Sequence, residues 1–427
     1  MSFEEQNRRT LIDYFVNSGK GTESKSELGL EVEHFVVRAD DLQGVPYSDP
    51  EGRLDVHGIL EYLSTFYPER SFTREGDLIG LAGPTATVTL EPAAQVEVSI
   101  APYSTVADVM HEYNAFRGRL DPFLAEHGCK IVSEGCHPRN KARELPLIPK
   151  QRYRFMDDYF AQIGTHGERM MRASTSTQVS IDYLDEADAV RKMRVAQALS
   201  VVLASLTDDA TMMEGEPATA RLTRFNLWRD VDDARCGSVP GLFEEGYGFS
   251  DYVDWVLRTC PIFITRAAAD DPEGPSVRGM AGKTAEEAYA DAPLTDEDIE
   301  HLLSMFWPDV RLKRFVEIRP ADAMPAPLIA AYVALIKGLF YSEDSLCAVE
   351  EAFGVKDGIW PLDDQSTNRA LAEVRAQGDA ALIYGRPLVD WEDFVLSLSR
   401  AALDEEERAY LEPLAERTEE RHAGVKA

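Results

Sequence analysis

Apolar and polar residues alternate along much of the first third of the chain, most clearly in ATVTLEPAAQVEVSIAP at residues 86–102. An alternation of period two places successive side chains on opposite faces of a β-strand. The segment therefore predicts two strands joined by a turn at residues 92–94. Glu91 ends the first strand, and Glu97 lies on the polar face of the second. The predicted hairpin thus brings two carboxylates close to one turn.

A second strand with a carboxylate face is predicted at residues 27–40, which read ELGLEVEHFVVRAD. Leu30 and Val32 share its apolar face, and Glu31 and Glu33 share the opposite face. Because residues two apart on a strand lie on the same side, these two carboxylates are expected to be neighbours.

Two later segments continue the pattern. Residues 174–182 are predicted as a strand whose polar face carries Gln178 between serine hydroxyls. Residues 310–319 are predicted as one further strand, with Glu317 and Arg319 on the same face. That face also holds two more basic residues and one aromatic residue, Arg311, Lys313 and Phe315.

Helices are predicted where the apolar spacing changes to about 3.6 residues. They cover residues 3–18, 104–128 and 186–209, and the last of these is expected to be strongly amphipathic. From residue 325 onward the chain is predicted to be helical.

The chain shows no internal repeat and no clear linker, so we expect one α+β domain over residues 1–427. Its sheet-forming core covers about residues 27–325, and a helical layer covers about residues 326–427. The sheet is predicted to be curved and mainly antiparallel, with a concave face that carries the glutamates.

Composition limits the classes of partner. The net charge is −31, from 44 basic and 75 acidic residues, and such a surface repels phosphate backbones. We therefore expect no nucleic acid partner. No apolar run is long enough to span a bilayer, and the first ten residues contain no signal core. The sequence predicts a cytoplasmic protein without a membrane partner, whose acidic surface serves solubility or adaptation to salt.

The five cysteines are odd in number, form no CxxC motif and have no zinc-type spacing. We expect free thiols in a reducing compartment. Cys136 precedes His137, but nothing nearby in the sequence would orient this histidine, so we expect no nucleophilic role for the thiol.

The glutamates of the predicted strands suggest a site for divalent cations. Two carboxylates about 4 Å apart repel each other by roughly 4 kcal/mol at an effective dielectric near 20. Oxygen ligands without a Cys or His pattern favour Mg²⁺, with Mn²⁺ as a second choice. The alternative is that each strand is half-exposed and its glutamates are simply solvated. No Walker loop, dinucleotide fingerprint or kinase motif occurs, so a nucleotide would be bound through metal.

At this point six segments, in order, resemble the glutamate–cysteine ligase family of the plant and proteobacterial type, which has a glutamine-synthetase-like fold. GLEVEHF resembles the family's first strand, and VTLEPAAQVEVS resembles its L-E-P-G-G-Q-x-E-L-S hairpin. The other matching segments are PKQRYRFMDDYF with MMRASTSTQVSIDYLDEADAVRKMRV, then RFNLWRDVDDARCG, GYGFSDYVDWVL and PDVRLKRFVEIRPAD. The resemblance covers about residues 29–340.

The resemblance implies a role for each polar position. The expected Mg²⁺ ligands are Glu31, Glu33, Glu91, Glu97 and Glu317. Arg319, with Glu317 beside it, is expected to act on the transferred phosphoryl group. Four residues are expected to contact substrates, namely Gln95, Gln178, Arg224 and Trp228, with Arg224 holding a substrate carboxylate. The turn departs from the family pattern, because Ala93 and Ala94 replace two glycines.

The implied reaction joins L-glutamate to L-cysteine at the expense of ATP, through a γ-glutamyl phosphate, as the first step of glutathione-type thiol synthesis. A related γ-glutamyl ligase that uses another amine, or a non-catalytic regulatory member of the family, is the alternative. The expected partners are thus ATP, glutamate and cysteine, in a monomer or a homodimer.

Overall fold

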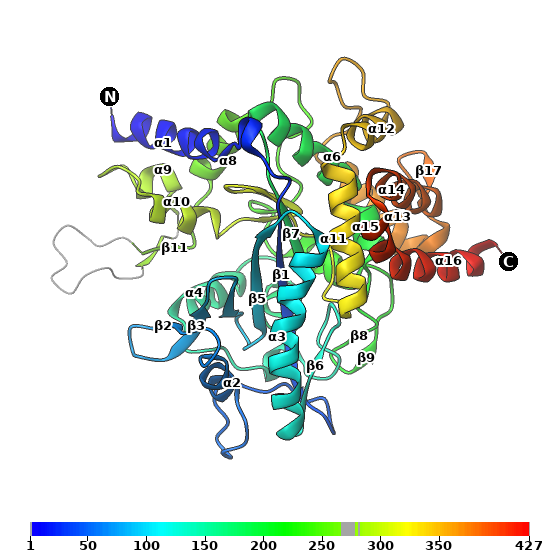
Figure 1. Ribbon diagram of the computed structural model, residues 1–427. Helices are drawn as coiled ribbons and strands as arrows, with labels where there is room; N and C mark the ends of the chain where they lie inside the picture. The colour runs from blue at the N-terminus through cyan, green and yellow to red at the C-terminus, as the bar shows by residue number, and fades with distance from the viewer. Residues whose placement is uncertain (1, 266–277, 281, 427) are drawn as a thin grey trace.

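The computed structural model describes residues 2–265, 278–280 and 282–426. Its main feature is a nine-stranded antiparallel sheet in the order β14-β15-β7-β1-β5-β4-β3-β2, with β6 paired to the far end of β1 (Figure 1). The strands are β1 (Leu28–Arg38), β2 (Glu69–Phe72), β3 (Leu78–Ala82), β4 (Ala86–Leu90), β5 (Val96–Tyr103), β6 (Cys129–Val132), β7 (Thr177–Ile181), β14 (Val310–Leu312) and β15 (Val316–Ile318).

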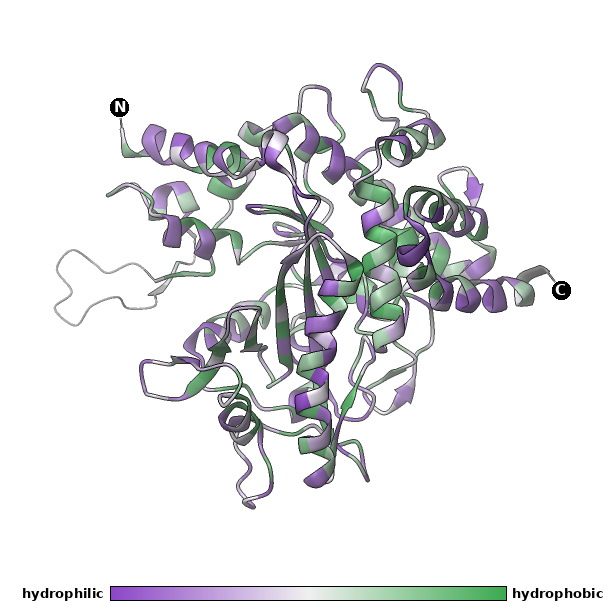
Figure 2. Cartoon of the chain, viewed as in Figure 1, coloured by the Kyte–Doolittle hydropathy of each residue, from purple (hydrophilic) through white to green (hydrophobic). Residues whose placement is uncertain are grey.

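Helices cover one face of this sheet. The helix α3 (Val106–Glu126) packs on β5 and β6, and α11 (Ala326–Phe340) packs on β7 and β1. Figure 1 shows these two helices side by side in front of the sheet, and Figure 2 shows that α11 is largely hydrophobic. The apolar residues of β1, β5 and α11 form one continuous core that also reaches α1 (Phe3–Ser18).

The remaining helices surround the sheet at its other face and its ends. They are α2 (Val56–Leu63), α4 (Gln151–Phe160), α5 (Gly167–Ala173), α6 (Glu186–Leu206), α7 (Thr223–Leu227), α8 (Phe249–Arg258), α9 (Ala285–Ala288), α10 (Asp296–Leu303), α12 (Glu343–Phe353), α13 (Ser366–Gln377), α14 (Leu388–Ala402), α15 (Glu405–Arg408) and α16 (Glu412–Lys426). Four short strand pairs complete the structure: β8 (Met212–Met213) with β9 (Glu216–Pro217), β10 (Cys236–Gly237) with β13 (Trp307–Pro308), β11 (Phe263–Ile264) with β12 (Arg278–Gly279), and β16 (Leu382–Ile383) with β17 (Arg386–Pro387).

The helix starts follow from side chains that satisfy free backbone N–H groups. Thr105 accepts from the backbone N–H of Asp108 at the start of α3, and Asp185 accepts from that of Asp188 at the start of α6. The expected helices at residues 3–18 and 104–128 and the strands at residues 27–40 and 86–102 are confirmed.

The prediction of one strand over residues 310–319 is wrong. The segment is a hairpin in which β14 and β15 are joined by three residues, and Arg311 lies directly opposite Glu317. The loop contains no Gly, Pro, Asn or Asp, so the sequence carries no local turn signal there. The backbone N–H of Lys313 donates to the carbonyl of Phe315 and closes the turn.

The prediction that α6 is strongly amphipathic is wrong for its second half, because every residue from Val195 to Leu206 is buried. The sheet hairpin β14–β15 packs against α6, and so do α13 and α14 of the C-terminal layer. The single domain over residues 1–427 stays a prediction, which the continuous core from Leu11 to Leu414 favours.

Among the described residues, no single helix is long and apolar enough to cross a bilayer. Only α11 and α12 taken together reach the required length and composition, across a bend of 82°.

Candidate active site

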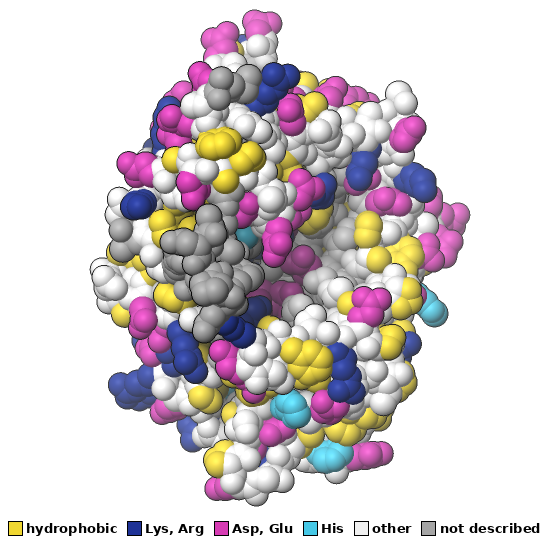
Figure 3. Space-filling model, turned by 90° about the vertical axis from the view of Figure 1, so that its left-hand side faces the viewer, with side chains coloured by type: hydrophobic (Ala, Val, Ile, Leu, Met, Phe, Trp, Pro, Cys, Tyr) yellow, Lys and Arg dark blue, Asp and Glu magenta, His cyan; other side chains and the backbone are white. Residues whose placement is uncertain are grey.

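A cavity of about 370 Å³ lies on the sheet face opposite α3 and α11. Strands β1, β4, β5 and β7 form its floor, and residues of α4, α5, α7 and β13 form its walls. Figure 3 shows the hollow, with acidic side chains at its depth. Nine of the ten predicted site residues line this cavity: Glu31, Glu33, Glu91, Gln95, Glu97, Gln178, Arg224, Trp228 and Arg319.

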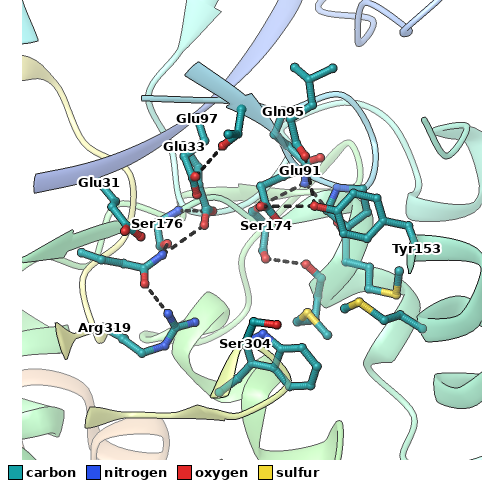
Figure 4. Close-up of a pocket in the computed structure, with 18 of the residues that line it drawn as sticks. Glu31, Glu33, Glu91, Gln95, Glu97, Tyr153, Ser174, Ser176, Ser304 and Arg319 are labelled. Carbon is teal, nitrogen blue, oxygen red and sulfur yellow. Dashed lines mark hydrogen bonds between the residues drawn. The ribbon is translucent and has the colours of Figure 1, made fainter. Parts of the chain in front are cut away.

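The floor carboxylates are brought together by strand register. Glu33 on β1 lies directly opposite Glu97 on β5. Glu31, two residues earlier on β1, lies opposite Gln178 on the other neighbouring strand, β7. The apolar partners of these residues point the other way into the core, as the period of two requires. Figure 4 shows Glu31, Glu33 and Glu97 side by side.

Crowding and burial perturb these carboxylates. Burial, together with repulsion from Glu317 and Glu97, raises the pKa of Glu31 to about 7. Burial and repulsion from Glu91 and Glu97 raise the pKa of Glu33 to about 8. Burial and repulsion from Glu91 raise the pKa of Glu97 to about 7. The floor therefore carries more negative charge than the protein itself compensates.

Hydrogen bonds satisfy the floor only in part. Glu33 accepts from the backbone N–H of Ser176 at 2.8 Å and from Nε2 of Gln178 at 3.3 Å. Glu97 accepts from Oγ1 of Thr89 at 2.7 Å. Within the described part of the chain, Glu31 accepts no hydrogen bond. Several carboxylate oxygens thus remain available to a ligand.

Glu317 differs from the floor carboxylates, because it is fully buried and its charge is matched. Both of its oxygens accept from Arg311, at 2.7 and 3.0 Å. Lys313 donates to it at 3.2 Å and Arg319 at 2.9 Å. Burial alone would raise the pKa of Glu317, but these three cations hold it well below its usual value. Its role as a metal ligand stays a prediction, and a bound ion would have to displace one of the cations.

Arg319 lies between Glu317 and two residues that are predicted to contact substrates, Gln178 and Trp228. Besides Glu317, its Nη1 donates to Oε1 of Gln178, and its guanidinium lies 5.8 Å from the ring centre of Trp228. The guanidinium is thus fixed above β7 and β15, beside the cavity. This position is compatible with its predicted role near a phosphoryl group.

Most hydrogen-bond donors of Arg224 are used by acceptors within the protein. Its Nε donates to Asp322 at 2.8 Å, and its Nη2 donates to the backbone carbonyls of Arg319, Pro320 and Ala321. Only Nη1 donates to no described residue. The expected bidentate contact with a substrate carboxylate stays a prediction, and this geometry leaves one nitrogen for it.

Gln95 holds the turn of the predicted hairpin. Its Oε1 accepts from the backbone N–H of Ala93, and its Nε2 donates to the carbonyls of Met171 and Ser174. Since both amide hydrogens are used, a substrate contact by Gln95 stays a prediction that this geometry does not favour. Ala94 has φ = 68°, a left-handed conformation that costs a residue with Cβ about 1–2 kcal/mol relative to glycine.

Sequence reasoning missed the basic residues of α4. Lys150 precedes the helix, and Arg152 lies in its first turn, where its guanidinium donates to Oγ and to the carbonyl of Ser304. Both side chains line the cavity. Three basic residues in PKQRYRF, within an acidic chain, were the available signal.

The donor set fits a hard divalent cation. Its members are carboxylate oxygens in excess charge, which are the ligands that Mg²⁺ prefers. Among the residues that the structure describes, no three acidic, His or Cys side chains converge into a ready-made metal site. A bound cation would therefore have to draw the floor carboxylates together.

The antiparallel sheet, with a carboxylate floor beside fixed cations, can hold positive and negative ligand groups next to each other. The chain belongs to the glutamate–cysteine ligase family 2, whose model matches residues 27–427. It is 30% identical over 346 residues to the chloroplastic glutamate–cysteine ligase B of Oryza sativa subsp. japonica, covering 81% of this chain and 68% of the relative. It is 32% identical over 344 residues to the chloroplastic enzyme of Arabidopsis thaliana, covering 80% and 64%.

A solved structure supports the fold class. The glutamate–cysteine ligase of Francisella tularensis in complex with AMP superposes with a TM-score of 0.53 at 9% identity, covering 92% of this chain and 82% of that one. The predicted α+β fold of the glutamine-synthetase-like ligases is thereby confirmed, and so is the predicted family.

Proposed function

We propose that this protein is an ATP-dependent ligase that forms γ-glutamylcysteine from L-glutamate and L-cysteine. In the first step the γ-carboxylate oxygen of glutamate bonds to the γ-phosphorus of ATP. The bond from that phosphorus to the bridging oxygen breaks, and ADP leaves with the electron pair. In the second step the amine nitrogen of cysteine bonds to the acyl carbon, phosphate leaves, and the amine proton passes to solvent.

The single observation that carries this proposal is the carboxylate floor facing fixed cations in one cavity. Glu31, Glu33, Glu91 and Glu97 would hold Mg²⁺, which supplies charge neutralisation for the ATP phosphates. Arg319, fixed by Glu317 and Gln178, would meet negative charge on the transferred group. The chain then acts by positioning and electrostatics, and the reaction needs no protein nucleophile.

The test is ADP release by the purified protein, measured with all substrates and with each one omitted. We expect release to require glutamate, an amine and a divalent cation, to stop in excess chelator, and to resume on adding Mg²⁺. Full activity in excess chelator would contradict the metal proposal.

A panel of amines decides between cysteine and another acceptor. We expect cysteine to give the highest kcat/KM, with γ-glutamylcysteine identified by mass spectrometry. A preference for another amine would favour the related γ-glutamyl ligase, and absence of ADP release with every amine would contradict the ligase proposal.

A further inference from the structure

Six basic side chains line the cavity: Lys150, Arg152, Arg224, Arg311, Lys313 and Arg319. Five of them donate to protein acceptors, among them Ser304, Asp322 and Glu317. Lys150 is the exception. Among the described residues its ammonium has no hydrogen-bond acceptor and no carboxylate within the 4.0 Å limit of a salt bridge. It lies 5.0 Å from the ring centre of Tyr153.

The backbone around Lys150 is fixed to the carboxylate floor. The N–H of Ile148 donates to the carbonyl of Pro92 at 2.9 Å. The hydroxyl of Tyr153 donates to the carbonyl of Leu90 at 3.0 Å and reaches Glu91 at 3.4 Å. Lys150 is therefore held beside the β4–β5 turn by contacts on both sides of it in the sequence, while its own side chain is left uncommitted.

Lys150 is half-buried, and a cation partly removed from water without a close partner costs free energy unless a ligand compensates it. Burial lowers the pKa of Lys150 and the neighbouring Arg152 adds to the shift, while the more distant Glu91 and Glu97 oppose it. An anion bound beside this ammonium would offset that cost. The lysine side chain carries a compact charge with three donors, and it binds phosphate oxygens as a point charge.

We propose that the Lys150 ammonium binds the phosphoryl group during its transfer and the phosphate that then leaves. This inference rests on the proposed ligase function. In the first step Lys150 donates to oxygens of the γ-phosphoryl group while the bond between the γ-phosphorus and the bridging oxygen of ADP breaks. In the second step it stabilises the phosphate released from the acyl carbon. Lys150 is then a catalytic residue and Arg152 a neighbour that orients Ser304.

The first test is steady-state kinetics of Lys150→Met, with ATP, glutamate and cysteine varied separately. Loss of a donor that acts in the transition state should lower kcat by about 100-fold or more and change the KM of glutamate little. Lys150→Arg should recover part of the loss. The matched control is Lys130→Met, which removes the same charge at an exposed position on β6, and it should retain the parent kcat.

A raised KM for glutamate at unchanged kcat would overturn the proposal, because Lys150 would then hold the substrate carboxylate. An unchanged kcat and KM would overturn it as well.

The second test does not depend on activity. Inorganic phosphate should raise the melting temperature of the parent protein and of Lys130→Met, but not that of Lys150→Met. Without phosphate, Lys150→Met should melt within a few degrees of the parent, since the ammonium has no hydrogen bond or ion pair to lose and gives up only its contact with the Tyr153 ring. Lys150→Gln gives the same readout where the Met variant fails to fold.

Equal stabilisation of all variants by phosphate would overturn the role of Lys150 while leaving the proposed function intact. Absence of ADP release by the parent would instead contradict the function, and the phosphate test would still decide the role of Lys150.

Discussion

Two acidic centres in this protein, one lining the cavity and one fully buried, differ in how completely basic and donor groups compensate their charge. On the cavity floor, Glu31 and Glu97 have raised pKa values and few hydrogen-bond donors. In the C-terminal layer Glu392, which is 0% exposed, accepts hydrogen bonds from Ser205 at 2.6 Å and His422 at 2.6 Å, and it forms an ion pair with Arg421 at 2.5 Å.

The difference separates structural from functional carboxylates. Burial alone would raise the pKa of Glu392, but its partners hold it below the usual value. Glu392 on α14 thereby ties α16 to the end of α6. A carboxylate whose partners come from the protein holds helices together, and carboxylates that lack them are available to ligands.

Neutralising the cavity floor should have the largest effect. Glu97→Gln removes a proposed metal ligand, so we expect the rate of ADP formation to fall by about 100-fold or more. The same change relieves repulsion, so the melting temperature of the protein without ligands should rise. Glu126→Gln, at the exposed end of α3, is the matched control for both measurements. Parent-like activity of Glu97→Gln would show that this floor carboxylate is not needed for the reaction.

The corresponding Glu→Gln substitution at Glu392, in the C-terminal layer, should lower stability and leave activity nearly unchanged. Glu392→Gln removes the buried carboxylate that contacts Arg421 and His422 and leaves Arg421 only its 3.2 Å ion pair with Asp379, so we expect unfolding free energy to fall by up to about 3–5 kcal/mol. Activity at low temperature should stay within a few-fold of the parent, because α14 and α16 contribute no residue to the cavity. Denaturant unfolding and ADP release measure the two effects. A stabilised Glu392→Gln would show that the contacts of Glu392 do not compensate its buried charge.

The two centres also predict a pH dependence of stability. The pKa of Glu33 is about 8 in the folded protein and near 4.5 when unfolded, so the folded state binds more protons between these values. Stability without ligands should therefore decrease as pH rises from about 5 to 8. Glu392, with a lowered pKa, contributes only below that window.

Melting temperatures measured across this range should fall by a few degrees in the parent protein and by less in Glu33→Gln. An equal slope in both proteins would show that Glu33 does not titrate in this window.

The smallest effect is expected at a buried thiol. All five cysteines are free, as expected, and burial raises the pKa of Cys136 far above neutral pH. A protonated thiol is a poor nucleophile. Cys136→Ser should leave kcat within a few-fold of the parent, and an inactive but folded variant would contradict this.

The sequence was sufficient for the strands that form the cavity floor, because their period of two survives in the structure. Glu31 and Glu33 share a face for that local reason alone. The β14–β15 hairpin could not be predicted, since its turn is fixed by pairing with distant β7 and not by turn residues. Lys150 was missed for a related reason, because its place depends on a hydrogen bond from Ile148 to a turn more than 50 residues earlier.

The strand order also has a consequence for how the chain is made. Strands β1 and β15 both pair with β7, although about 290 residues separate Glu31 from Glu317. At about 5–20 residues per second of synthesis, β1 is complete roughly 15 to 60 s before β15. For about the second half of that interval, after Ile181 has been added, β7 is an open edge, a surface on which other chains can aggregate. Strand β7 is only five residues long, and so short an edge limits such pairing until β15 covers it.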